Sequence, residues 1–271
     1  ASAMGYGFTG TPIFDENKRQ RKGILARTTE GLYGPCLHKY TIKEALHNKA
    51  VLGFQIEYKD SLSHDQLLEL GEKLGLGAAD DLAEGDAAET EAKVLAAYQK
   101  REGHDVYDSD AHRMEVIDCI VTRAAWKFHP NAERGNAYEA ILTVPSIPIA
   151  KRYYKLIQQF VADGKVSESV RAKCVDFPKV AITYTVTEND VGSIGNQEDM
   201  QASLDDYNAM FGTKFQLAEL GAYNTNLNDR LARKKGMYRL RENQLDIVIV
   251  VDRLLTGFDA PPCAIPSVDR P

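Results

Sequence analysis

Three apolar, β-branched runs constrain the fold of this chain more than any other feature of its sequence. They are AYEAILTV at 137–144, KVAITYTV at 179–186 and LDIVIVV at 245–251, each bordered by polar residues, proline or glycine. Strands that are buried on both faces, as in a parallel sheet covered by helices, are apolar at nearly every position. We therefore expect these runs to be parallel, central strands of one sheet.

Helical patterns separate the three runs. The segment 147–164 has apolar residues at helical spacing and ends in glycine, and the segments 197–212 and 227–242 precede the third run. Strands that alternate with helices predict an α/β fold with a mostly parallel sheet and helices on both faces. A fourth run, VLGFQIEY at 51–58, alternates more strongly and is expected as an edge or half-exposed strand.

The stretch 61–110 has a different composition. It is acidic, rich in alanine and leucine, and interrupted by glycine, which predicts a helical insertion with a mobile tip around 77–85. The following segment, 111–128, is expected to form one long amphipathic helix that leads back to the sheet. Within it, Trp126 is expected to pack in the core or at the helix end, rather than to form a platform for base stacking.

Composition narrows the function classes. The 271 residues are 44% apolar and 27% charged, with a formal net charge of −6, so any contact with nucleic acid must depend on local basic patches. The four cysteines are far apart in sequence and form no CxxC pair. This argues against a zinc site and predicts a reduced, cytoplasmic protein.

Familiar catalytic motifs are missing from the sequence. It contains no GxxxxGK[ST] phosphate loop, no GxSxG and no HExxH, and its six histidines are scattered. A self-contained catalytic centre is therefore not predicted, and no metal site is expected.

Two turn-like stretches have features that suggest more than an ordinary turn. YGFTGTPIF, at 6–14, places a hydroxyl-rich turn after an apolar segment. IVIVVDRLLTGFDAPP, at 247–262, is a buried strand that leads to Gly257 and Asp259. A glycine at the carboxyl end of a parallel strand allows close approach to a phosphate, and open α/β sheets bind ligands at this edge. Each stretch alone is a weak signal.

Together, and in this order, the segments resemble the R (motor) subunit of type I restriction enzymes, in its superfamily two helicase region. GFTGTPIF resembles helicase motif III, and the stretch from LYGPCLHKYTIKEAL to VLGFQIEY resembles the crossover into the second RecA-like domain. AYEAILTVPSIPIAKRYY resembles motif IV, and LDIVIVVDRLLTGFDAP resembles motif V. The resemblance extends over essentially the whole chain.

The resemblance implies a RecA-like, P-loop NTPase-type fold. Residues 1–40 would be the end of the first RecA-like domain and the linker, and 41–271 the second domain with its insertion at 61–110. The chain would be a fragment, truncated before motif VI and inactive alone, of a motor that uses ATP and Mg²⁺. The magnesium ligands would lie outside it. The partners would be double-stranded DNA and the methyltransferase and specificity subunits, with no membrane.

The resemblance also assigns roles to six residues. Thr9 and Thr11 would couple the state of the γ-phosphate to the other domain. Gly257 and Asp259 would line the ATP cleft, with Asp259 near the ribose or a missing arginine. Ser146 and Thr256 would face DNA and bond to its phosphates.

The roles of two basic runs are not decided by the sequence, and two other functions are compatible with it. The run 18–22 is equally compatible with phosphate contact and with a disordered loop, whereas for 230–241 a solvated helix face is favoured slightly over DNA contact. The chain is also compatible with another superfamily two helicase, against which TGFDAP and LHKY weigh. A third interpretation is a RecA-like binding module without turnover.

Overall fold

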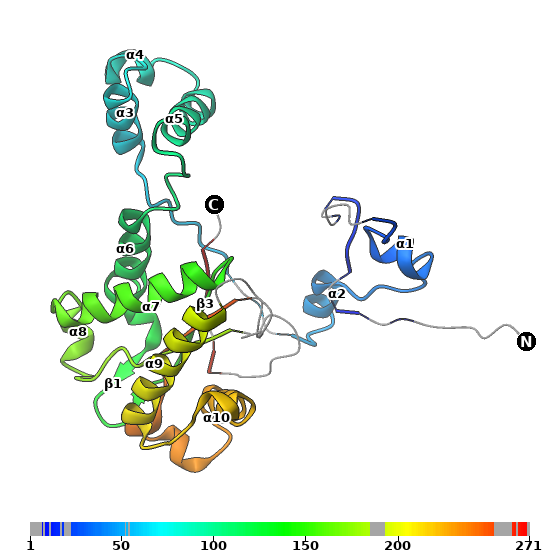
Figure 1. Cartoon of the computed structure of the whole chain (residues 1–271), viewed down its shortest axis with the longest axis vertical. Helices are drawn as coiled ribbons and strands as arrows, with labels where there is room; N and C mark the ends of the chain where they lie inside the picture. The colour runs from blue at the N-terminus through cyan, green and yellow to red at the C-terminus, as the bar shows by residue number, and fades with distance from the viewer. Residues whose placement is uncertain are drawn as a thin grey trace, which may run out of the picture. The chain divides into compact units, whose positions relative to one another are not determined.

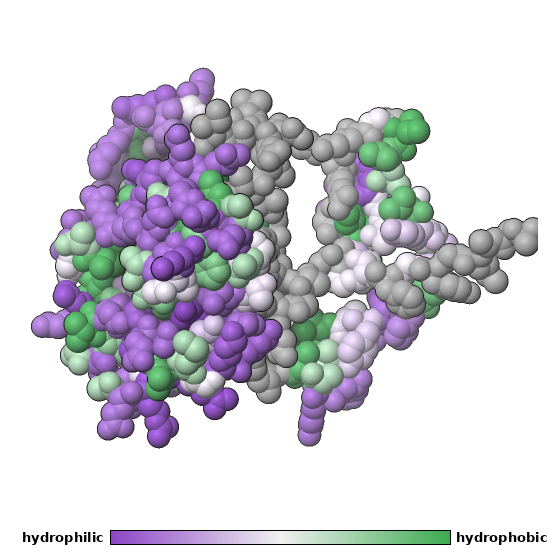
Figure 2. Space-filling view, turned by 60° about the horizontal axis from the view of Figure 1, so that its bottom comes forward, coloured by the Kyte–Doolittle hydropathy of each residue, from purple (hydrophilic) through white to green (hydrophobic). Residues whose placement is uncertain are grey.

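The computed structural model describes most of the chain, namely residues 7, 9–10, 12–16, 18, 23–51, 53, 55–184, 193–251, 262–263 and 265–269 (Figure 1). The chain separates into two compact units, Ala1–Lys59 and Asp60–Pro271. On the face shown in Figure 2, the surface of the larger unit is mostly hydrophilic, with apolar residues in small groups.

The larger unit is built on a parallel four-stranded sheet. Its strands are β3 (Ala140–Thr143), β4 (Val180–Thr183), β5 (Ile247–Val250) and β6 (Ile265–Val268), in the order β4-β5-β3-β6. Ala140 pairs with both Ile247 and Ile265, and Val180 pairs with Ile247, so all neighbours are parallel. Every residue of β3, β4 and β5 is buried. The α/β fold and the three expected strands are thus confirmed.

Strand β6 was not expected, and its sequence explains why. It reads IPSV, and Pro266 lacks the N–H that a central strand needs on both sides. Among the described residues β6 pairs only with β3, as an edge strand, where proline is tolerated.

Two long helices flank the sheet. Helix α7 (Ile147–Ala162) has proline in its first turn, and Gly164, with a φ of 71°, follows its end. Its buried face includes Tyr153, Ile157 and Phe160, and each such side chain contributes roughly 1.5–3 kcal/mol by burial. Helix α9 (Ser193–Phe211) covers the expected segment 197–212 and contacts β4. Between α7 and β4 lies the short helix α8 (Glu168–Arg171).

The helix expected at 227–242 is correct only in its first part. Helix α10 (Leu220–Leu231) follows the 3₁₀ turn η3 (Leu217–Glu219) and ends before Arg233, whose φ of 48° breaks the helix. Two further 3₁₀ turns, η4 (Gly236–Arg239) and η5 (Arg241–Asn243), lead to β5.

The insertion is helical, as expected. It contains α3 (His64–Lys73), α4 (Ala79–Ala83) and α5 (Ala87–Glu102), and α4 occupies the glycine-bordered tip. Ser63 and Gln66 form a capping box at the start of α3. Gly71 allows close packing, because a Cβ there would lie 2.7 Å from Leu82 and 2.9 Å from Val94.

The single helix expected at 111–128 changes type along its length. It is α6 (Asp110–Asp118), then the π turn η1 (Cys119–Arg123), then the 3₁₀ turn η2 (Ala125–Phe128). A π turn holds an extra residue and so rotates the residues that follow. Phe128 is therefore buried, whereas Trp126 is 64% exposed, and the expected packing of Trp126 is wrong. A short antiparallel pair, β1 (Pro130–Asn131) and β2 (Gly135–Asn136), leads to β3.

The smaller unit contains the helices α1 (Thr29–Tyr33) and α2 (Ile42–His47). The strand expected at 51–58 is not formed by its described residues, 51, 53 and 55–58. Ile56 is 62% exposed and Tyr58 is 87% exposed, so the alternating pattern has no sheet to pack against among the described residues.

Candidate functional site

The carboxyl ends of the parallel strands form the edge where open α/β sheets bind ligands. At this edge β3 leads through Val144 and Pro145 to Ser146, the N-cap residue of α7. Ser146 is partly buried and its backbone is extended, with φ of −154° and ψ of 159°, and its side chain makes no capping hydrogen bond. The first N–H groups of a helix attract anions. A hydroxyl and a helix N-terminus are therefore presented together at this edge.

The structure places two of the six candidate residues. Thr9 is described and exposed, in the smaller unit, and Ser146 lies in the larger one. The other four, Thr11, Thr256, Gly257 and Asp259, lie outside the described residues, as does most of the basic run 18–22.

The segment that follows the TGTP turn is fixed to α1 within the smaller unit. The N–H of Ile13 donates to Thr29 Oγ1 at 2.7 Å, and the N–H of Thr29 donates to the carbonyl of Ile13 at 2.9 Å. This reciprocal pair gives the backbone after the turn a defined position against a helix, which an unconstrained loop would lack.

Sequence reasoning missed Asp269 at the same edge of the sheet. It directly follows β6, and its N–H donates to the carbonyl of Thr143 at 3.0 Å. Its carboxylate accepts from Tyr153 Oη at 2.8 Å and lies 2.9 Å from His112 Nε2. Burial opposes ionisation, but these hydrogen bonds outweigh it and hold the pKa of Asp269 below its ordinary range. The sequence signal was weak, because Pro266 obscures the strand that positions this aspartate.

A small cavity of about 70 Å³ lies between α7 and α9, and its polar groups are paired within the protein. Asp199 forms ion pairs with Lys151 and, at 3.3 Å, with Lys155. Asp206 accepts from Tyr154 Oη at 2.9 Å and from Gln158 Nε2 at 2.7 Å. These contacts join the two helices. The polar side chains that line the cavity therefore bind one another.

Three arginines of the basic run 230–241 point into the protein. Arg230 lies 3.8 Å from the ring centre of Phe211 and donates to the carbonyl of Asn243 at 2.8 Å. Arg233 Nε donates to Glu139 at 3.0 Å, and Arg241 donates to Asp246. For these three residues both a solvated helix face and DNA contact are wrong, because buried carboxylates, carbonyls and rings surround them.

Two of these arginines, Arg233 and Arg241, belong to a buried polar network at the amino ends of the strands. Asp246 is fully buried and accepts from Asn136 Nδ2 at 2.8 Å, from the N–H of Lys179 at 2.7 Å, and from both terminal nitrogens of Arg241 at 2.6 and 2.8 Å. Burial raises the pKa of the neighbouring Glu139 to about 8, although Arg233 opposes the shift. The network joins β3, β4 and β5 at the edge opposite Ser146.

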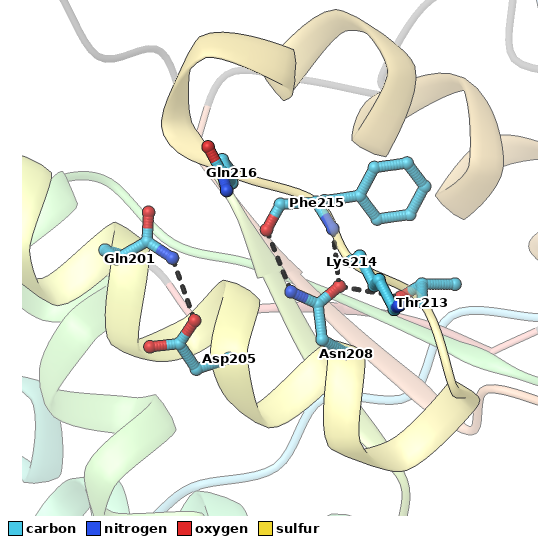
Figure 3. Close-up of a pocket in the computed structure, with 7 residues that line it drawn as sticks. All are labelled: Gln201, Asp205, Asn208, Thr213, Lys214, Phe215 and Gln216. Carbon is cyan, nitrogen blue, oxygen red and sulfur yellow. Dashed lines mark hydrogen bonds between the residues drawn. The ribbon is translucent and has the colours of Figure 1, made fainter.

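Figure 3 shows an open pocket of about 540 Å³ at the C-terminal end of α9. Its central residue is Asn208, which accepts from Thr213 Oγ1 and from the N–H of Phe215, both at 2.8 Å. Asn208 also donates to the carbonyl of Phe215 at 2.8 Å. The polar groups close the turn after α9, so we assign the pocket a structural role.

The described residues contain no group of three or more histidine, cysteine, aspartate or glutamate side chains placed to hold a metal ion. No described helix combines the length and apolar character that crossing a membrane requires.

Comparison with known proteins gives two family matches. Residues 136–271 match the family described as type I restriction enzyme subunit R domain 3. Residues 1–78 match the family described as SWI2/SNF2 ATPase. The first match includes the whole parallel sheet and Ser146, and the second includes Thr9, Thr11 and the smaller unit.

Curated relatives agree with these matches. A type I restriction enzyme endonuclease subunit of Staphylococcus aureus (strain COL) is 29% identical over 264 residues, and that of Staphylococcus saprophyticus is 29% identical over 259 residues. In both comparisons the alignment covers 96% of this chain and 23% of the relative. The chain thus spans about a quarter of the length of the curated relatives it matches.

Proposed function

Since the chain belongs to the family of type I restriction enzyme R subunits, we propose that it supplies the second half of an ATP-driven DNA motor. The observation that carries this proposal is that the carboxyl edge of the parallel sheet lies beside Ser146 and the start of α7 in the larger unit. Ser146 is partly buried at this edge, and both it and the N-terminus of α7 lie within the region that matches the R subunit family. The match of residues 1–78 to an ATPase family supports nucleotide use.

In this proposal ATP and Mg²⁺ are bound between two RecA-like domains. In this proposal residues 1–40 end the first domain and 41–271 form the second, whereas the compact units of the structure divide between Lys59 and Asp60. Thr9 and Thr11 sense the γ-phosphate through hydroxyl hydrogen bonds, and Gly257 and Asp259 line the cleft. The magnesium ligands and the phosphate loop belong to sequence outside this chain. Electrostatic stabilisation by both domains then favours phosphoryl transfer when the cleft closes.

Ser146 and Thr256 are proposed to contact the DNA backbone. The geometry at Ser146 supports this for one of the two, because its hydroxyl and the following N–H groups suit a phosphate oxygen. Phosphate contacts fix position without reading sequence, as a translocating motor requires. Arg230, Arg233 and Arg241 of the basic run have no part in this proposal, since their hydrogen bonds are made within the protein.

The parent protein is proposed to act in the cytoplasm on double-stranded DNA, together with the methyltransferase and specificity subunits. The names of the relatives, endonuclease subunits of type I restriction enzymes, support such an assembly. DNA cleavage would be carried out by parts of the parent outside this chain.

Replacement of Asp259 by alanine in the full-length parent tests the proposal. A carboxylate beside a phosphate site must act on the ribose or orient a cation, because it repels the phosphate itself. Loss of such a charge-assisted hydrogen bond is about 1.5–3 kcal/mol, or on the order of ten- to hundred-fold in kcat if it acts in the transition state. A normal kcat with a lowered melting temperature would reduce Asp259 to a turn residue. A parent that binds DNA and never hydrolyses ATP would favour the binding module.

A further inference from the structure

The helices α3, α4 and α5, here called the helical arm, have an apolar core of their own. Leu67, Leu68 and Val94 are buried among these three helices. Among the described residues, none of the three belongs to the apolar cluster around the sheet, which includes Ile117 of α6 and Phe128 of η2. Packing alone therefore does not join the arm to the sheet. The connection depends on two stems, an incoming one at 60–62 before α3 and an outgoing one at 103–109 between α5 and α6.

Polar contacts hold both stems. In the incoming stem, Ser61 Oγ lies 2.6 Å from His112 Nδ1. Where the outgoing stem meets α6, Asp110 accepts from Arg152 Nε of α7 at 2.8 Å, and Arg113 donates to Asp110 and to Asp108 of the stem. Asp110 and Arg152 are 44% and 48% exposed, so their ion pair is screened and contributes little.

His112 makes the more protected contact. Its side chain and that of Asp269 are each 11% exposed, and His112 Nε2 lies 2.9 Å from Asp269 Oδ1. The other carboxylate oxygen of Asp269 accepts from Tyr153 Oη, and the N–H of Asp269 is bonded to Thr143. Because the carboxylate of Asp269 can only accept, Nε2 of His112 donates to it. The other ring nitrogen, Nδ1, is then available to bond with the hydroxyl of Ser61. One imidazole thus joins the incoming stem, α6 and the residue that follows β6.

We propose that His112 is a positioning residue that couples the helical arm to the carboxyl edge of the sheet. Asp269 directly follows β6, at the edge that presents Ser146 and the N-terminus of α7. A displacement of the arm stem is transmitted through His112 to this edge, and a change at the edge is transmitted back to the arm. The consequence for turnover rests on the proposed motor function, whereas the mechanical linkage does not.

Amide hydrogen exchange on the full-length parent protein tests the linkage. His112→Ala removes both contacts, whereas His112→Gln places an amide near the position of Nε2 and can keep the bond to Asp269 alone. His104→Ala is the matched control, because His104 lies after α5 and bonds to the carbonyl of its neighbour Asp105. Loss of a hydrogen bond to a charged group predicts a local opening constant about 10- to 100-fold larger.

The expected pattern is specific. In His112→Ala, exchange rises in the incoming stem at 60–62 and also at 265–269, while β3, β4 and β5 stay protected. In His112→Gln protection returns at 265–269 only. The kcat for DNA-stimulated ATP hydrolysis falls in His112→Ala with an unchanged KM for ATP, because His112 touches no nucleotide in this account.

Two results would overturn the proposal. One is exchange that rises only around residue 112, with 265–269 unaffected. The other is a kcat for His112→Ala equal to that of His104→Ala. A parent without any DNA-stimulated turnover would reject the proposed motor instead, and the exchange pattern, which is measured without ATP, would still decide the linkage.

Discussion

Replacement of Asp246 by asparagine should destabilise the chain far more than the same change at Asp176. Both carboxylates bind Arg241: Asp246 with two hydrogen bonds of 2.6 and 2.8 Å, and Asp176 with one of 2.8 Å to Nε. They differ in burial, because Asp246 is fully buried whereas the side chain of Asp176 is 46% exposed. Asp246 also accepts from Asn136 and from the N–H of Lys179, whereas the second partner of Asp176 is the side chain of Lys179. The comparison therefore sets a buried, fully hydrogen-bonded carboxylate against a half-exposed one that binds the same arginine.

Removal of one partner from a buried ion pair is strongly destabilising, by about 3–5 kcal/mol, because the remaining charge has no compensation. Exposed pairs contribute about 0–1 kcal/mol. We therefore expect Asp246→Asn to lower the free energy of unfolding by about 3–5 kcal/mol and Asp176→Asn by less than about 1 kcal/mol. Urea unfolding of both variants and the wild-type chain, followed by far-ultraviolet circular dichroism, measures the difference. Equal losses in the two variants would refute the reasoning.

Two further stability predictions follow from the same edge of the sheet. Burial raises the pKa of Glu139 to about 8, so the folded state retains a proton that the unfolded state releases, and stability falls as the pH rises from about 4.5 to 8. The Glu139→Gln variant has no such proton, so this loss of stability with pH should be absent from it. Between pH 5.5 and 7.5, urea unfolding should show the free energy of unfolding of the variant rising relative to that of the wild-type chain by about 2–3 kcal/mol, at about 1.4 kcal/mol per pH unit. A difference between the two proteins that does not change with pH would contradict this. Gly135→Ala should lower the melting temperature measurably, since Gly135 has a φ of 77° and a Cβ there would lie 2.7 Å from Arg241 Cδ. An unchanged melting temperature would show that the hairpin adapts.

The central strands could be predicted because their residues are apolar at nearly every position. A strand such as IVIV at 247–250 can be satisfied only between two covered faces of a sheet, so local sequence determines its environment. The same reasoning failed for the run at 51–58. Alternation indicates a strand only where a neighbouring strand and a core exist, and a short window of sequence contains no information about either.

The arginines of 230–241 show a different limit. Their spacing and charge are those of a surface helix, and nothing local indicates that Arg233 meets Glu139. Glu139 is 94 residues away from Arg233 along the chain, so the pairing depends on the completed fold. The candidate site shows the same division. Ser146 was assigned through the family resemblance of the segment that contains it, whereas Asp269 depends on an edge strand interrupted by Pro266.

The most direct test of the proposed motor is ATP turnover by the full-length parent, assembled with its partner subunits, with and without duplex DNA. The 271-residue chain alone serves as the comparison, since its sequence contains no GxxxxGK[ST] loop to bind the phosphates. The account predicts turnover by the parent that rises when duplex DNA is added, and none by the chain alone. Turnover that is independent of DNA, or measurable turnover by the chain alone that is lost on mutation of a residue within it, would contradict the account.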